Sequence, residues 1–91
     1  MPITHNLYTL SSGSATLVVA PNTQPQQVYL HNATKSSNEY IYIGTQTVGT
    51  ANSIHLDPGE SLTVQLGPGD DLWAISDPNG LKLGVMVVKQ D

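Results

Sequence analysis

Three histidines are the residues best suited to chemistry in this chain, because imidazole is the commonest protein ligand for zinc, copper and nickel. They stand far apart, at His5, His31 and His55, and no H-x-H or H-x₃-H pair occurs. The chain has no cysteine, which excludes thiolate zinc sites, iron–sulfur clusters and a thiol nucleophile within these residues. The spacing therefore predicts no metal site, and we expect no cofactor.

Acid–base catalysis would need paired carboxylates, and Asp57, Glu60, Asp70 and Asp71 stand in two adjacent turn-forming stretches. Asp and Glu are ordinary turn residues, however, and the spacing of an EF-hand is absent. A serine nucleophile in a G-x-S-x-G elbow is absent too. The glycine-rich run 67–71 joins two expected strands rather than opening a helix, so it is not a phosphate loop. We predict no catalytic residues and no enzymatic activity.

The composition narrows the range of partners. The 91 residues suit a single domain, and only 11 % are charged, with a formal charge of −4. With three basic residues in all, the chain lacks the positive surface that nucleic-acid binders need. No apolar run approaches the roughly 18 residues that span a bilayer, and the first residues do not resemble a signal peptide. We expect neither a nucleic-acid partner nor a membrane partner.

Alternation of apolar and polar residues is the main structural signal, and it indicates half-buried β-strands. It is clearest over 61–66, where Leu62, Val64 and Leu66 share one face. In the carboxy-terminal run, alternation sets Leu81, Leu83, Val85 and Val87 on one face. Ile54 and Leu56 are expected to point inward, as are Ile41 and Ile43. The strands are predicted over seven ranges: 15–20, 26–31, 39–43, 53–56, 61–66, 72–76 and 81–88.

Turn residues separate these strands. Asp57–Glu60 reads D-P-G-E, with proline and glycine at the positions that a tight turn requires, and joins 53–56 to 61–66. The stretch Asp77–Gly80 is predicted to form a hairpin loop. No window combines helical periodicity with helix caps. The fold class expected is all-β: one small antiparallel β-sandwich, jelly-roll-like, of about seven strands with little or no helix; alternation alone does not exclude a closed barrel.

The first 14 residues lack firm alternation and end in S-S-G-S, so they predict a flexible amino-terminal arm, with residues 15–91 forming the sandwich domain. The alternative is an edge strand or a frayed terminus. If the arm reaches onto a neighbouring subunit, its anchors are expected to be Ile3, Leu7, Tyr8 and Leu10.

Aromatic residues suggest a second contact surface. Tyr29, Tyr40 and Tyr42, together with Met86, lie on the sides of their strands that face away from the predicted core, and such residues are enriched at protein interfaces. Trp73 shares a face with Ile75, so it belongs either to the core or to a subunit contact. We expect these five aromatic and methionine side chains to contribute to an interface with an oligomer partner or a larger particle.

Five short segments have an order that resembles small β-rich virion proteins of tailed bacteriophages, of the capsid decoration (cement) or head-fibre type. The resemblance covers residues 28–88. The segments that carry it are V-Y-L-H-N (28–32), I-Y-I-G (41–44), L-D-P-G-E-S-L (56–62), G-D-D-L-W-A-I-S (69–76) and V-M-V-V (85–88).

The resemblance implies a non-enzymatic structural protein on the capsid surface of the virion, with the major capsid protein as its partner. It also implies a homo-oligomer, for which a trimer is favoured. Similar modules occur on tail fibres and head fibres, so the alternative is a module that binds carbohydrate or a host cell-surface receptor. The resemblance transfers no catalytic or metal-binding residue.

Overall fold

The computed structural model describes residues 3–49 and 54–90 of the chain. These residues form eight β-strands and no helix, which confirms the all-β prediction and adds one strand to the seven expected. The strands are β1 (Ile3–Thr9), β2 (Thr16–Val19), β3 (Gln26–Asn32), β4 (Tyr40–Gly44), β5 (Ile54–Leu56), β6 (Ser61–Leu66), β7 (Leu72–Asp77) and β8 (Lys82–Lys89). Met1 and Pro2 of the predicted arm, and Ser53 of the predicted strand 53–56, lie outside the described residues.

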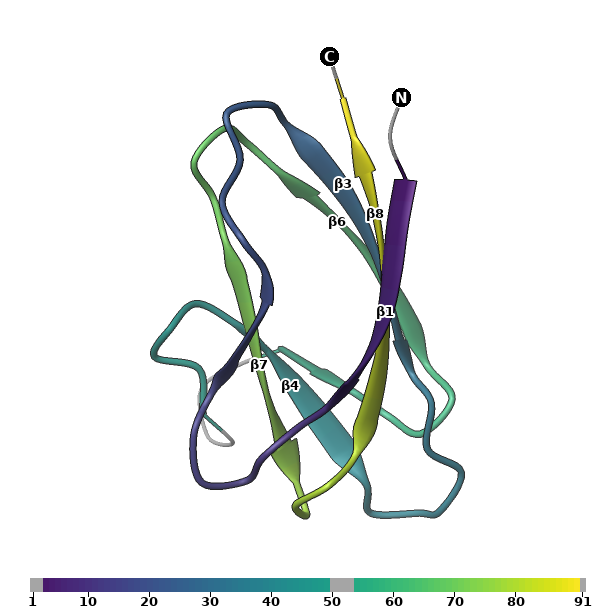
Figure 1. The fold of residues 1–91 in the computed structure, drawn as a ribbon. Helices are drawn as coiled ribbons and strands as arrows, with labels where there is room; N and C mark the ends of the chain where they lie inside the picture. The colour runs from purple at the N-terminus through teal and green to yellow at the C-terminus, as the bar shows by residue number, and fades with distance from the viewer. Residues whose placement is uncertain (1–2, 50–53, 91) are drawn as a thin grey trace.

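The strands form two antiparallel four-stranded sheets that pack face to face. Sheet A has the order β1-β8-β3-β6 and sheet B the order β2-β7-β4-β5. The pairs β1·β8, β2·β7, β3·β6 and β4·β5 all occur, so the chain is a long two-stranded ribbon rolled into a sandwich. This is jelly-roll connectivity, and it confirms the predicted sandwich. Figure 1 shows β1 and β8, the first and last strands, side by side.

The core lies between the sheets and follows the alternation of the sequence. In β3, Gln26, Val28, Leu30 and Asn32 are buried, while the residues between them are half-buried or exposed. The expected inward sets of β4 and β8 are buried as predicted, and Leu62 and Val64 pack partly buried against the same cluster. Ile54 is the exception among the inward predictions: it is 67 % exposed. Among the described residues, its strand has three residues and pairs with β4, at the margin of sheet B.

The turn at Asp57–Glu60 forms as predicted, but it does not close a hairpin. The Glu60 amide donates to the Asp57 carbonyl at 2.9 Å, and the Asp57 amide donates to Glu60 Oε1 at 3.0 Å. β5 belongs to sheet B and β6 to sheet A, so the turn carries the chain from one sheet to the other. The hairpin predicted at Asp77–Gly80 is wrong, because β7 and β8 lie in different sheets. A turn motif predicts that the chain reverses direction at that point. It does not predict which strand the next strand will pair with.

Gly59 offers a direct test of this turn. Its φ is +78°, and a Cβ there would meet no atom within 4 Å, so a side chain costs backbone strain and no steric clash. Gly59→Val should lower the free energy of unfolding by about 1–3 kcal/mol, measured by urea denaturation. Gly13, whose φ is not positive, provides the control Gly13→Ala, which should leave stability nearly unchanged. Equal stability of the two variants would contradict the turn geometry.

The first residues are an edge strand in the structure. β1 pairs with β8 over its whole length, from Ile3↔Val88 to Thr9↔Lys82. This differs from a flexible arm and agrees with the edge-strand alternative. The Leu10 amide donates to the Leu81 carbonyl at 2.8 Å, and the Leu10 carbonyl accepts from the Gly80 amide at 2.9 Å. Leu10 is 2 % exposed, so its side chain belongs to the core and is not available as a surface anchor.

Candidate functional site

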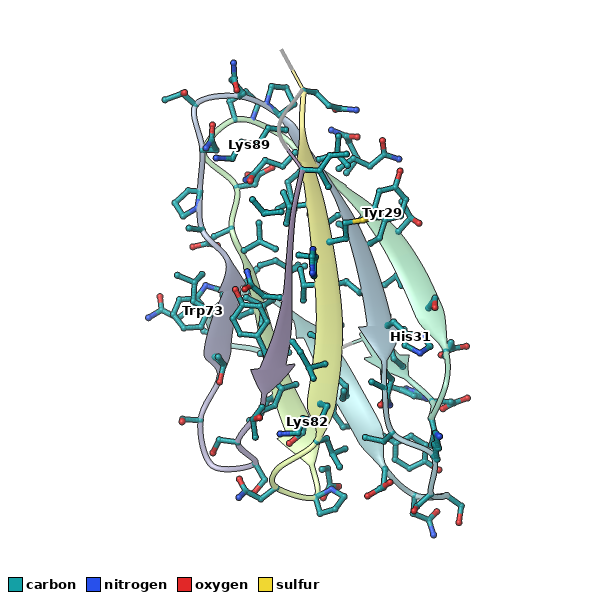
Figure 2. The ribbon with its side chains drawn as sticks, turned by 45° about the vertical axis from the view of Figure 1, so that its right-hand side comes forward. Tyr29, His31, Trp73, Lys82 and Lys89 are labelled. Carbon is teal, nitrogen blue, oxygen red and sulfur yellow. The ribbon has the colours of Figure 1, made fainter. Side chains whose placement is uncertain are left out.

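The residues predicted to contact an oligomer partner or a larger particle lie on opposite sides of the sandwich. Face A, defined as the outward side of sheet A, carries Ile3, Leu7, Tyr29 and Met86. Face B, the outward side of sheet B, carries Tyr40, Tyr42 and Trp73. Figure 2 places the labelled Trp73 and Tyr29 at opposite margins of the view. Of the remaining predicted residues, Tyr8 points inward and packs half-buried against the core, and Leu10 is part of it.

Face A gathers most of the exposed apolar surface. Six large apolar residues are exposed in the described part of the chain, and four of them, Ile3, Leu7, Tyr29 and Met86, lie on this face. Leu7 is the most exposed of the four, at 63 %. Apolar side chains gathered in this way on a solvent-facing sheet mark interaction surfaces.

A groove of about 510 Å³ runs across face A, and a glycine forms its floor. Leu7, Gly84, His31 and Ser61 are directly opposite one another on β1, β8, β3 and β6. Because Gly84 has no side chain, the middle of this row is a hollow between Leu7 and His31. Tyr29 and Met86, in the adjacent row, form a wall of the groove. Figure 2 shows Tyr29 and His31 spaced along β3.

Polar side chains in the groove and at the end of face A pair with polar side chains on the neighbouring strands. His31 Nδ1 lies 2.8 Å from Ser61 Oγ across the β3–β6 pair. Lys82, at the end of the face, donates from Nζ to Thr9 Oγ1 at 2.6 Å. The groove lining contains no Asp, Glu, Lys or Arg, although it includes His5 and His31. A groove of this kind suits an apolar side chain better than an ionic ligand.

Face B is aromatic and less exposed. Leu72 and Ala74 point into the core, so Trp73 and Ile75 lie on the outer side of β7; Ile75 is 8 % exposed and Trp73 is half-buried. Leu17 of β2 is paired with Trp73 and is 38 % exposed. The ring of His55 lies between two tyrosines, with centroids 5.5 Å from Tyr40 and 5.8 Å from Tyr42. This face therefore presents aromatic rings, but Nε1 of Trp73 is buried and has no hydrogen-bond partner in the structure.

The side chains that suggested catalysis do not converge. Glu60 Oε1 accepts from its own turn, and Asp70 Oδ2 accepts from the Gly67 amide at 2.9 Å, so both carboxylates serve their turns. His55 Nε2 lies 3.2 Å from Asp57 Oδ1 on an exposed edge. Among the described residues, no three His, Cys, Asp or Glu side chains come together in a way that could hold a metal ion. The same residues include no helix that could cross a membrane.

Comparison with known proteins finds a similarity in fold. No family model matches the sequence, and no curated protein sequence matches it. Among solved structures, it is similar to a chain from the Bacillus endospore appendages, which are described as a family of disulfide-linked pili. The TM-score is 0.60 at 12 % identity, and the match covers 99 % of this chain and 87 % of the other. At this identity the likeness concerns the fold alone.

The sequence did not lead us to predict Gly84 and His31 as site residues. The sequence does contain an indication for Gly84, because a glycine inside a predicted strand often marks a place where another group approaches closely. Its position between Leu7 and His31 depends on the β1·β8 and β8·β3 registers, which local patterns do not reveal. Leu17 was missed because its neighbour across the strands, Trp73, is far away in sequence.

Proposed function

We propose that this chain is a non-enzymatic structural protein that binds the outer surface of an assembled tailed-phage capsid and stabilises it. The observation that carries the proposal is that both outward faces of the sandwich bear apolar or aromatic side chains. A sandwich that works alone in water normally has polar outer faces. Two such faces on opposite sides suit a subunit that contacts neighbours within a larger particle.

Stabilisation would follow from mass action. A protein that binds only the assembled capsid lattice lowers the free energy of that lattice by RT ln(1 + [L]/Kd) at each site. Because a capsid has many such sites, a modest affinity at each site is sufficient to stabilise it. We assign the capsid contact to face B, because aromatic residues are enriched at the centres of protein interfaces. The solved neighbour, part of disulfide-linked pili, gives an example of this fold in an assembly. The present 91 residues contain no cysteine and would associate through non-covalent contacts.

Co-sedimentation with undecorated capsids of tailed phages tests the proposal. Wild-type protein should pellet with the capsids and saturate at a fixed number of copies per particle. Leu17→Asp places a charge on face B and should weaken binding at least about tenfold. Thr23→Asp adds the same charge to an exposed loop residue away from both faces, and it should bind like wild type. Circular dichroism confirms that both variants fold. No pelleting of the wild type would refute the proposal.

A second function is favoured by one feature of face B. Tyr40, Tyr42 and His55 form an aromatic cluster beside the Asp57 carboxylate, and rings next to hydrogen-bonding groups are a common arrangement for binding sugars. The chain would then be a fibre module that recognises carbohydrate or a host receptor. A glycan array with specific hits, combined with no capsid pelleting, would support this function and not the first.

A further inference from the structure

We propose that β1 is a pairing edge, through which two copies of the chain join their A sheets. In this dimer the β1 strands of the two copies run antiparallel about a twofold axis, with Asn6 of one copy opposite Asn6 of the other. The two A sheets then form one continuous sheet. The dimer uses neither face B nor the groove on face A, so it is independent of the proposed capsid contact.

One side of the β1 backbone has no partner among the described residues. β1 forms the margin of sheet A and pairs there with β8 (Figure 1). Leu10, which continues the strand, directs both its amide and its carbonyl to the segment just before β8. Backbone groups alternate in direction along a strand, so those of every second residue point away from the sheet. These residues are Ile3, His5, Leu7 and Thr9. A row of unpaired amides and carbonyls is a template for another strand.

β1 is also the least protected of the four sheet margins. Residues 3–9 include no proline and no Lys, Arg, Asp or Glu, the residues that usually keep an edge strand from pairing. Of the described margins in sheet B, β5 has three residues, and β2 has four with an irregular register. β6, the other margin of sheet A, has polar outward side chains at Ser61, Thr63 and Gln65. In β1, by contrast, the outward Ile3 and Leu7 are 62 % and 63 % exposed.

The inner side of β1 is open to solvent as well. Thr4 and Asn6 face sheet B, yet both are exposed, whereas their partners Val87 and Val85 on β8 are buried. A hollow of about 170 Å³ lies at this margin, between the inner side of β1 and the end of β2. The sandwich is therefore not closed beside β1, and a further strand there would cover both polar side chains.

The register favours a second copy as the source of that strand. When β1 pairs with itself about Asn6, each residue with free backbone groups meets another: Ile3 meets Thr9, and His5 meets Leu7. All the free groups are used, in about eight hydrogen bonds between the two strands. The two Leu7 side chains become diagonal neighbours on the outer face, at a separation across which long side chains interact. Pairing with β6 of another copy would instead set Ile3 and Leu7 beside polar side chains.

This contact closes at two copies, because an isologous interface uses the same patch on both. In strand addition the main-chain hydrogen bonds supply the affinity and the alternate side chains supply the specificity. The contact is narrow, so the association should be weak, reversible and dependent on protein concentration.

Cysteine trapping tests the register, because the chain has no cysteine of its own. In the dimer the two Asn6 residues form a non-hydrogen-bonded pair, with Cα atoms about 4.5 Å apart, which a disulfide bridges. Asn6→Cys should therefore give a covalent dimer under mild oxidation, at least about tenfold faster than the control Thr63→Cys. Thr63 is equally exposed but lies on β6, at the opposite margin of the same sheet.

Sedimentation equilibrium of the purified chain without capsids tests the backbone pairing. Wild type should pass from monomer to dimer as its concentration rises. His5→Pro removes an amide that points away from β8, a position where edge strands tolerate proline, and should weaken dimerisation at least tenfold. His5→Thr keeps the amide and should dimerise like wild type. Circular dichroism shows whether each variant folds. If His5→Pro does not fold, Leu7→Lys takes its place, because it adds a charge to the same edge and should weaken dimerisation similarly.

Three outcomes would overturn the proposal: a wild type that stays monomeric, a folded His5→Pro that dimerises like wild type, or Asn6→Cys that cross-links no faster than Thr63→Cys. The capsid assay gives a separate answer. A dimer that does not pellet with capsids would refute only the proposed function, and a monomer that pellets would refute only the dimer.

Discussion

Replacing Asn32 with alanine should lower the free energy of unfolding by about 3–5 kcal/mol, close to the loss of all measurable structure in a domain of this size. Asn32 is 0 % exposed, and its Nδ2 donates to the carbonyls of Glu39 and Leu56, at 3.0 Å each. Its Oδ1 accepts from the Thr34 hydroxyl at 2.6 Å and the Thr34 amide at 3.2 Å. Alanine would leave the carbonyl oxygens of Glu39 and Leu56 without this donor, at a position that is fully buried in the protein.

Urea denaturation measures this loss, and Asn6→Ala is the control. Asn6 is an exposed asparagine of β1, so its replacement should change stability by less than about 0.5 kcal/mol. Asn32→Asp refines the test, because a carboxylate facing two carbonyl oxygens is disfavoured in the folded state. Its destabilisation should therefore grow as the pH rises above about 4, the ordinary pKa of Asp. Similar stabilities for Asn32→Ala and Asn6→Ala would show that the amide does not link the sheets.

The hydrogen bonds of Asn32 also affect whether this residue is available for N-glycosylation. Asn32, Ala33 and Thr34 match the acceptor pattern for N-glycosylation. In the fold the amide nitrogen that would carry the sugar is committed to two carbonyls inside the protein. The same side chain ties the end of β3 to β5 and to the segment before β4, so it connects sheet A with sheet B.

The second large effect is expected at Leu10. Leu10→Ala should cost about 2–5 kcal/mol, since Leu10 is 2 % exposed and belongs to the main core cluster. Leu7→Ala, three residues earlier, should cost less than about 0.5 kcal/mol, because Leu7 is 63 % exposed. Thermal unfolding of the two variants compares these effects. Equal small effects would mean that residue 10 belongs to an arm and not to the core.

Much of the sandwich follows from alternation in the sequence. The inward positions of β4 and β8 were predictable because the inward face of each strand is apolar, and a shift by one residue would expose it. The pairing of strands was not predictable in the same way. D-P-G-E at 57–60 is predicted to form a tight turn and D-P-N-G at 77–80 a hairpin loop, yet each carries the chain between sheets. Which strand pairs with which depends on contacts between distant segments.

The positions of the amino-terminal residues and of the site residues also could not be predicted fully from local sequence patterns. β1 alternates weakly because its edge position leaves Thr4 and Asn6 exposed even on the side that faces the core. The residue types on face A, such as Leu7, Tyr29 and Met86, were recognisable as contact-forming. Their separation from Tyr40, Tyr42 and Trp73 was not, because it depends on which sheet each strand joins.

The position of β8 determines when the protein can fold. β8 is the last of the eight strands, and it lies between β1 and β3 in the interior of its sheet. During synthesis, β1 must wait for nearly the whole chain to leave the ribosome before it finds its partner. Such distant pairing predicts slow, late folding, in which an unfinished chain exposes strand edges and depends on chaperones. A protease that removed this strand would leave β1 and β3 without their shared neighbour.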